Sequence, residues 1–146
     1  MRTVFAITAP RGAGASHLAV EVVTKLLPRA MLIDEHRYGL GPRDREIRPE
    51  RYICADWHGP AAEIRLNERQ AEKLRGVTDI VLVAHQMAAE KAQHLADRQG
   101  ARVLVLMFNP PKAPFPVPDD QRGQRLAAVR EAAMQAASDL LLGSPS

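Results

Sequence analysis

The sequence predicts an α/β fold, a three-layer parallel sheet with helices on both faces. Five short apolar runs alternate with segments of helical spacing, which is the pattern of consecutive βαβ units. Two of these runs, 79–84 and 102–108, are apolar almost without a break, and the first is of the kind that is buried on both faces of a sheet. A chain of 146 residues suits one domain with one core, so we expect residues 1–146 to form a single domain.

Composition narrows the class of protein. Hydrophobic residues make up 46% of the chain, but no apolar run approaches the roughly 20 residues of a membrane span. The N-terminal segment lacks the apolar stretch of a signal peptide, so we expect a cytoplasmic protein. Cys54 is the single cysteine, which excludes an internal disulfide, and its apolar neighbours predict a buried, inert thiol. A net charge of +3 permits nucleic-acid binding and leaves it open.

The first half of the chain contains three predicted strands. Residues 4–7 form the first, and a helix follows from residue 16, where Leu18, Val22 and Leu26 are three to four residues apart. Residues 30–33 form the second strand and residues 52–55 the third. Glycine, proline and alternating charges between residues 39 and 51 predict a surface loop.

The second half continues the alternation. We predict helices over residues 61–75 and 87–98, separated by the strand 79–84 and followed by the strand 102–108. Five prolines between residues 110 and 118 exclude a helix or central strand there. Residues 119–142 form the C-terminal helix, started by two aspartates, and 143–146 are a frayed tail. The predicted buried stripe of that helix consists of Leu126, Val129, Ala133, Ala137, Leu140 and Leu141.

The bend after the first strand resembles a phosphate-binding loop. A P-loop has the pattern G-x-x-x-x-G-K-[ST], and residues 9–16 match it at Gly14 and Ser16. Ala9 takes the place of the first glycine and Ala15 that of the lysine. The backbone can still surround a phosphate, but without that lysine we expect weak hydrolysis, with Arg11 as one substitute cation.

Two aspartates end predicted strands at the edge where ligands of parallel sheets collect. Asp34 follows the second strand and Asp56 the third. An aspartate facing the P-loop serine commonly holds Mg²⁺ on nucleotide phosphates. Ser16 could hold the ion with either Asp34 or Asp56. We predict Ser16 and Asp56 as the metal ligands, with Asp34 in support and both aspartates in the catalytic role. The alternative is that both aspartates only end strands or cap the next helix.

These segments together resemble the ParA/MinD-type P-loop ATPases, and most of all their CpaE/TadZ branch, in which the P-loop lysine is commonly absent. Residues 11–19 resemble the family's loop, 32–34 its second strand and 52–56 its Walker B strand. Residues 78–83 resemble the next strand, and 105–109 the strand that ends in an asparagine near the adenine. The resemblance implies ATP and Mg²⁺ as cofactors, ATP-dependent homodimerisation or a place in a larger assembly, and a role in positioning or assembly. The implied nucleotide-binding residues are Arg11, Gly12, Ala13, Gly14, Ala15, Ser16, His17 and Asn109.

Two other functions remain open. Asp34 and Arg37 resemble the D-x-x-R motif of small P-loop kinases of the polynucleotide-kinase and zeta-toxin group, which phosphorylate hydroxyl acceptors. Arg122 and Arg125 would then be lid arginines, or else the solvated face of the last helix. The third function is that of a non-catalytic scaffold that has kept the P-loop architecture.

Overall fold

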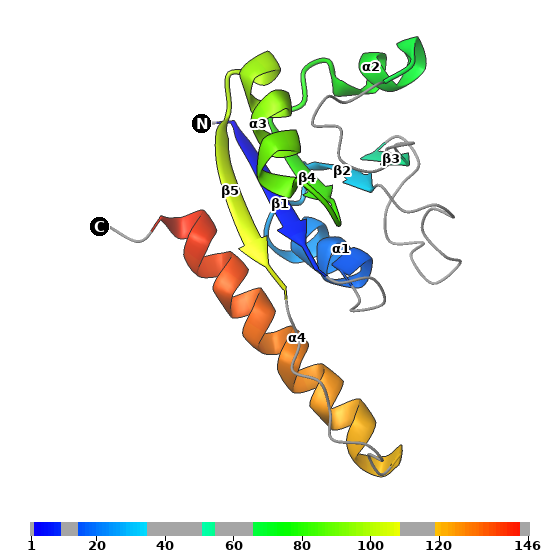
Figure 1. The fold of residues 1–146 in the computed structure, drawn as a ribbon, viewed down its shortest axis with the longest axis vertical. Coiled ribbons are helices and arrows are strands. Elements are labelled where there is room, and N and C mark those ends of the chain that lie inside the picture. Colours follow the sequence, from blue (N-terminus) through cyan, green and yellow to red (C-terminus); the bar gives the residue numbers. More distant parts are fainter. Residues whose placement is uncertain (1, 10–14, 35–50, 55–65, 109–118, 144–146) are drawn as a thin grey trace.

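The computed structural model describes residues 2–9, 15–34, 51–54, 66–108 and 119–143, with side chains of the last segment described from residue 128. Within these residues the chain forms one five-stranded sheet and four helices (Figure 1). The elements are β1 (Thr3–Thr8), α1 (Ala15–Lys25), β2 (Met31–Asp34), β3 (Tyr52–Cys54), α2 (Glu68–Leu74), β4 (Asp79–Val83), α3 (Ala88–Gln99), β5 (Arg102–Met107) and α4 (Asp119–Leu142).

The sheet is parallel throughout, with the strand order β3-β2-β4-β1-β5. β1 lies between β4 and β5, so Thr3 is level with both Asp79 and Arg102. Asp34, the last residue of β2, is level with Val83, the last residue of β4. The carboxyl ends of these strands therefore meet at one edge of the sheet.

Helices cover both faces of the sheet, which is consistent with the predicted three-layer α/β fold. Side chains of β1 alternate between the two cores: Phe5 and Ile7 belong to the one under α1 and α4, and Val4 and Ala6 to the one under α3. The predicted stripe of α4 is confirmed where side chains are described. Ala133 and Ala137 are buried, while Val129, Leu140 and Leu141 are partly buried against the first core.

Helix α2 starts later than the predicted residue 61, because Leu66 and Asn67 are described and are not helical. Asn67 is the N-cap: its side chain accepts a hydrogen bond from the Gln70 amide, and the Gln70 side chain accepts one from the Asn67 amide. This reciprocal capping box satisfies two amide groups and sets the start of the helix at Glu68. Residues 61–65 lie outside the described part of the chain.

Helix α3 has a left-handed residue at each end. Gly100, with φ of +63°, closes its C-terminus, and its amide donates to the carbonyl of Ala96. Met87 precedes its N-terminus with φ of 51°, the one positive φ of a non-glycine residue in the described chain. Such a backbone conformation is strained for a residue with a side chain.

The prediction of a buried Cys54 is wrong: the side chain is exposed. β3 has only three residues and lies at the edge of the sheet. Ile53 points into the core under α3, so its neighbour Cys54 points away from that core, to the other side of the strand. In the described residues, no helix combines the length and apolar character needed to cross a membrane.

Candidate functional site at the carboxyl edge of the sheet

The topology of the sheet indicates that a ligand would bind outside the carboxyl ends of β1 and β4. These strands are neighbours, but the helices that follow them pack on opposite faces, α1 in one core and α3 in the other (Figure 1). In open α/β sheets, ligands bind at the place where successive connections diverge in this way. The end of β2 is level with that of β4, so it contributes to the same edge.

Ser16 and Asp34 are brought together at this edge. Ser16 is the second residue of α1 and Asp34 the last of β2, and the Ser16 Oγ donates a hydrogen bond of 2.8 Å to the Asp34 Oδ2. Asp34 is fully buried and Ser16 is half-buried. A short hydrogen bond from a hydroxyl to a buried carboxylate is of the strong, charge-assisted kind. The structure thus joins two residues that the sequence predicts to act on the same ligand.

The donor atoms of this pair suit Mg²⁺. The Ser16 hydroxyl gives its hydrogen to Asp34 and keeps its oxygen lone pairs for another partner. Hydroxyl and carboxylate oxygens are ligands that Mg²⁺ accepts, and the ion usually takes one or two protein groups beside water and phosphate. Within the described ranges, no three or more His, Cys, Asp or Glu side chains form a group that could hold a metal ion.

The start of α1 shows what position 15 can contribute. The Ala15 side chain is 4% exposed and belongs to the core under α1. It adds packing there but no charge. His17 is exposed. The first turn of α1 has no acidic residue, so no side chain of that turn opposes an anion at the positive end of the helix.

His85 connects the β4–α3 segment to the end of β1. Its Nδ1 lies 2.9 Å from the carbonyl oxygen of Ala9, and because a carbonyl only accepts, Nδ1 is the donor. One residue earlier, the Ala84 amide donates to the carbonyl of Ile7 over 3.1 Å. These two contacts hold the segment between β4 and α3 against the end of β1 and against Ala9, the last described residue before α1.

Lys91 is the unusual residue of α3. It is fully buried, and the residues around it on the helix, Ala88, Ala92 and Leu95, pack in the core between α3 and the sheet. Only three polar or charged residues are buried in the described chain, and Lys91 is the one that carries an amine. Burying an ammonium group costs several kcal/mol unless an opposite charge or good acceptors offset it.

The remaining predicted site residues are not placed by the structure. Arg11, Gly12, Ala13, Gly14, Asp56 and Asn109 lie outside the described residues. The strand order does locate the strand that precedes Asp56: β3 is at the far edge, with β2 and β4 between it and β1. At about 4.8 Å per strand, β3 is about 14 Å from β1. Among the two predicted aspartates, Asp34 is therefore the one whose contact with Ser16 is established.

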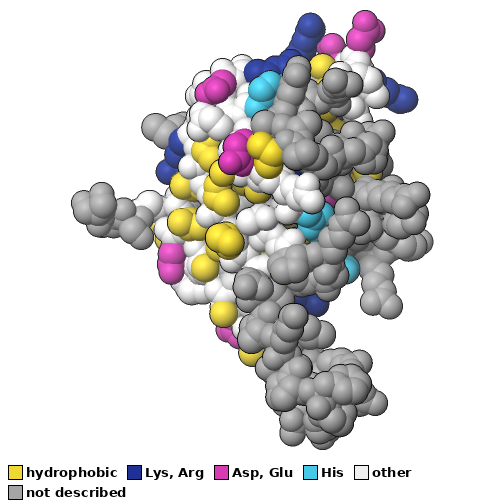
Figure 2. Space-filling view, in the orientation of Figure 1, with side chains coloured by type: hydrophobic (Ala, Val, Ile, Leu, Met, Phe, Trp, Pro, Cys, Tyr) yellow, Lys and Arg dark blue, Asp and Glu magenta, His cyan; other side chains and the backbone are white. Residues whose placement is uncertain are grey.

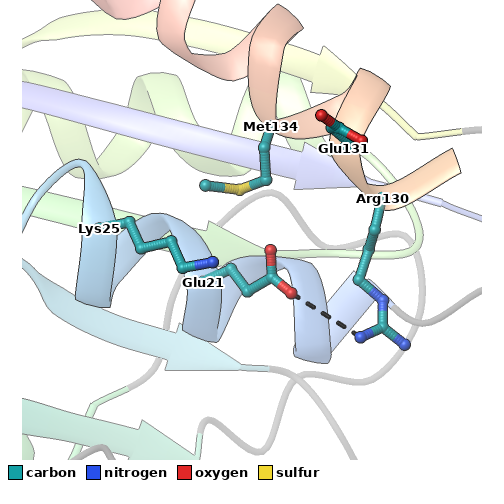
Figure 3. Close-up of a pocket in the computed structure, with 5 residues that line it drawn as sticks. All are labelled: Glu21, Lys25, Arg130, Glu131 and Met134. Atoms are coloured by element: carbon teal, nitrogen blue, oxygen red, sulfur yellow. Dashed lines mark ion pairs between the residues drawn. The ribbon is translucent and has the colours of Figure 1, made fainter. Parts of the chain in front are cut away.

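A groove of about 400 Å³ lies elsewhere, between α1 and α4. Figure 3 shows the Glu21 carboxylate and the Arg130 guanidinium pointing toward one another across it, with an ion pair of 3.7 Å. Lys25, Glu131 and Met134 complete its lining. Glu21 is five residues beyond Ser16, about 7.5 Å along the helix, and the lining charges have both signs. This groove is therefore separate from the Ser16–Asp34 pair and is not suited to a phosphate.

His85 and Lys91 are absent from the sequence-based predictions. Lys91 left a signal in the sequence, because it stands three residues after Ala88 and four before Leu95, in the middle of an apolar helical stripe. A lysine at such a position is either a boundary residue or a buried functional group, and periodicity alone does not distinguish them. The contact of His85 joins residues 76 apart in the chain, which no local pattern reveals.

Comparison of the chain with family models, with curated protein sequences and with solved structures gave no match in any of the three.

Proposed function

We propose that this chain binds ATP·Mg²⁺ outside the carboxyl ends of β1 and β4, hydrolyses it weakly or not at all, and uses the bound nucleotide to control self-association. This is the behaviour implied by the resemblance to ParA/MinD-type P-loop ATPases of the CpaE/TadZ branch. The observation that carries the proposal is the 2.8 Å hydrogen bond from Ser16, at the start of α1, to the buried Asp34.

Candidate partners can be named for the metal ion, the phosphates and the adenine. Ser16 and Asp34 supply oxygen ligands for Mg²⁺. The loop before α1, residues 10–14, is the proposed phosphate cradle, supported by the positive end of a helix without first-turn acids. Asp56 as a further metal ligand and Asn109 beside the adenine remain predictions from the sequence. Bound Mg²⁺ would supply neutralisation of phosphate charge, and the protein's residues would hold and orient the nucleotide.

Weak hydrolysis follows from position 15. In a working P-loop a lysine there reaches the β- and γ-phosphates and neutralises charge that develops during phosphoryl transfer. Ala15 instead packs its methyl group into the core. A site of this kind can bind a nucleotide and respond to it while cleaving it slowly, as suits a positioning or assembly factor.

The exposed side of β5 supports self-association with a second copy. β5 is an edge strand, its residues 102–105 are only half-buried, and Met107 is 77% exposed. Figure 2 shows hydrophobic side chains gathered on the face of the molecule over β5 and the C-terminal half of α4. An edge strand with apolar side chains is a ready template for pairing with another chain.

The small-kinase alternative is less well supported. It requires the Asp34 carboxylate as a general base that reaches an acceptor hydroxyl. Asp34 is fully buried and accepts a hydrogen bond from Ser16, which suits a metal-linked residue better than an accessible base. The scaffold alternative makes no demand on these residues and is decided by whether nucleotide binds.

Isothermal titration with ATP tests the proposal. We expect saturable binding in the presence of Mg²⁺, weaker binding when the metal is chelated, and a smaller metal dependence in Ser16→Ala. Thr24→Ala is the matched control, since Thr24 is on the same helix and its hydroxyl bonds only to carbonyls of that helix. Absence of binding at millimolar ATP would overturn both nucleotide-dependent functions and leave the scaffold.

Two further measurements separate the nucleotide-dependent functions. A shift from monomer to dimer on adding ATP·Mg²⁺, seen by size-exclusion chromatography, would support the ParA/MinD-like proposal. Transfer of labelled γ-phosphate to a hydroxyl acceptor in preference to water would support the kinase instead.

A further inference from the structure

We propose that two copies of this chain associate by pairing β5 with β5 in antiparallel orientation, so that one sheet continues through both subunits. This inference rests on the self-association part of the proposed function and does not depend on nucleotide binding. It assigns the strand that pairs, its direction and its register, with a two-fold axis beside Val105.

Every second residue of β5 turns its backbone amide and carbonyl away from the sheet. The Arg102 amide donates to the carbonyl of Arg2 over 3.0 Å, and the Phe108 amide donates to that of Thr8 over 2.8 Å. Even-numbered residues of the strand therefore face β1 with their backbone groups. The residues whose groups face outward are Val103, Val105 and Met107. Among the described residues, none forms a hydrogen bond with these outward amides and carbonyls.

The opposite edge of the sheet is covered. There, the Lys73 ammonium of α2 donates to the carbonyl of Tyr52 over 3.1 Å, and the Gln70 side chain donates to that of Cys54 over 3.2 Å. Native sheets avoid pairing with other chains by covering or charging their edges. Residues 103–107 of β5 contain no proline and no charged residue. Of the two edges formed by the described strands, that of β5 is therefore the one open to another strand.

The exposed side chains of β5 are apolar. Val103 and Val105 are only half-buried against the core under α3, and Met107, on the same side of the strand, is 77% exposed. α3 contacts β1 more extensively than it contacts β5, so it leaves this side of the edge strand partly uncovered. Hydrophobic side chains gather over β5 in Figure 2. A second apolar strand would cover them.

The distribution of charge favours a second copy as the occupant. Arg102 is the single charged residue of β5, and its guanidinium is held within the subunit by the Thr3 hydroxyl and the carbonyl of Leu141. A two-fold axis beside β5 therefore brings no like charges of the strand together, whereas a charged partner strand would find no opposite charge. The pattern Val-Leu-Val-Leu-Met is apolar in both directions, so β5 is complementary to itself.

Symmetry sets the direction of pairing, and the outward groups set its register. A strand that pairs with its own copy across a two-fold axis is antiparallel. With the axis at Val105, that residue lies opposite the partner's Val105, and Val103 lies opposite the partner's Met107. Each outward amide then has an acceptor on the partner, and the exposed Met107 is covered. Moving the axis by one residue would pair Val103 or Met107 with a residue outside the strand.

Analytical ultracentrifugation of the full-length chain tests the inference, using Val105→Lys, Val105→Glu and the control Cys54→Lys. We expect the parent to show a reversible monomer–dimer equilibrium. Either Val105 variant should raise the dissociation constant at least about 10-fold, because the axis sets two like charges side by side. An equimolar mixture of Val105→Lys and Val105→Glu should restore the dimer. Cys54→Lys adds charge to an exposed residue of the opposite edge strand and should stay within about twofold of the parent.

Two results would overturn the inference. One is a parent that stays monomeric at millimolar concentration, with and without ATP·Mg²⁺. The other is a dimer whose dissociation constant is the same in the parent and both Val105 variants, which would assign self-association to another surface. Neither result alters nucleotide binding as measured by titration. A parent that dimerises through β5 and binds no ATP would keep this inference and overturn the proposed function.

Hydrogen exchange of the unmodified protein decides the matter if the Val105 variants do not fold. The amides of Val103, Val105 and Met107 should exchange slowly at high protein concentration and lose that protection on dilution, because their acceptors lie on the partner. The amides of Leu104 and Leu106 face β1 in each subunit and should stay protected at both concentrations. Exchange of the outward amides that does not depend on concentration would contradict pairing through β5.

Discussion

At the scale of single residues, the contact most sensitive to substitution is the one between Ser16 and Asp34. Asp34 is fully buried at the end of β2, and a carboxylate in that position depends on hydrogen-bond donors to offset its lost hydration. Ser16 gives such a donor from another element, 18 residues earlier. The pair is therefore both a structural tie between α1 and β2 and the core of the candidate metal site.

Ser16→Ala should lower the free energy of unfolding by about 1.5–3 kcal/mol, the contribution of a hydrogen bond to a charged group. Urea denaturation measures this change. Thr24→Ala, in the same helix, should change stability by less than about 0.5 kcal/mol, because its hydroxyl bonds to helix carbonyls and alanine favours the helix. Equal effects of the two substitutions would show that the Ser16–Asp34 bond adds no stability.

Ala15→Lys should restore a P-loop lysine only at a cost to the fold. Ala15 is 4% exposed in the core under α1, so a long cationic side chain must displace apolar neighbours or extend past them to the carboxyl edge of the sheet. We expect a lower melting temperature without ligand and a larger rise on adding ATP·Mg²⁺ than in the parent, because phosphate offsets the buried charge.

Ala15→Met is the control for that substitution, with similar volume and no charge. It should also lower the melting temperature, but ATP·Mg²⁺ should then stabilise it no more than the parent. The same ligand-induced rise for the lysine and methionine variants would mean that position 15 does not face the phosphates.

At the scale of elements, α3 is flanked at both ends by a residue with a left-handed backbone conformation. It begins after Met87, with φ of 51°, and ends at Gly100, with φ of 63°. Strained backbone conformations tend to occur at functional positions, where the surrounding structure enforces them. Here the strained residue stands between His85, which contacts Ala9, and the helix that carries Lys91.

Met87→Gly should raise the free energy of unfolding by about 0.5–1 kcal/mol, since relief of left-handed strain exceeds the added flexibility of the unfolded chain. Gly100→Ala should lower it by about 1 kcal/mol, because it introduces the same strain at the other end of the helix. Urea denaturation of both variants checks the opposite signs. A destabilised Met87→Gly would show that the Met87 side chain, 37% exposed, contributes more through contacts than it costs in strain.

At the scale of the whole molecule, stability should be greatest at the centre of the sheet. β1 and β4 have strand neighbours on both sides and helices on both faces, whereas β3 is a three-residue edge strand whose last side chain is exposed. Regions with many buried apolar contacts open only through global unfolding, while edges open locally.

Native-state hydrogen exchange should therefore show the slowest amides in β1 and β4 and much faster exchange in β3. ATP·Mg²⁺ should add protection at the start of α1 and the end of β2, around Ser16 and Asp34, and little at the amino ends of the strands. Uniform added protection over the whole sheet would indicate general stabilisation by ligand and would contradict binding at the carboxyl edge.

Much of the architecture is visible in the sequence because it depends on local periodicity. Unbroken apolar runs predicted β4 and β5, and the three-to-four spacing predicted α1 and the buried stripe of α4. The contact between Ser16 and Asp34 could also be expected from the sequence, because a serine after a glycine-containing segment and an aspartate at the end of a strand both lie at the carboxyl edge of a parallel sheet. These features follow from patterns within one element or its immediate flanks.

The remaining features depend on which elements lie next to one another. Cys54 is exposed because β3 forms the edge of the sheet, and α2 starts at Glu68 because a reciprocal cap competes with the apolar spacing. Lys91 is buried because α3 turns that side chain toward the sheet. Periodicity, caps and apolar runs are properties of neighbouring residues and can be read along the chain. Strand order, the face that a helix covers and the resulting burial of a lysine arise from contacts between distant residues, so only the folded chain determines them.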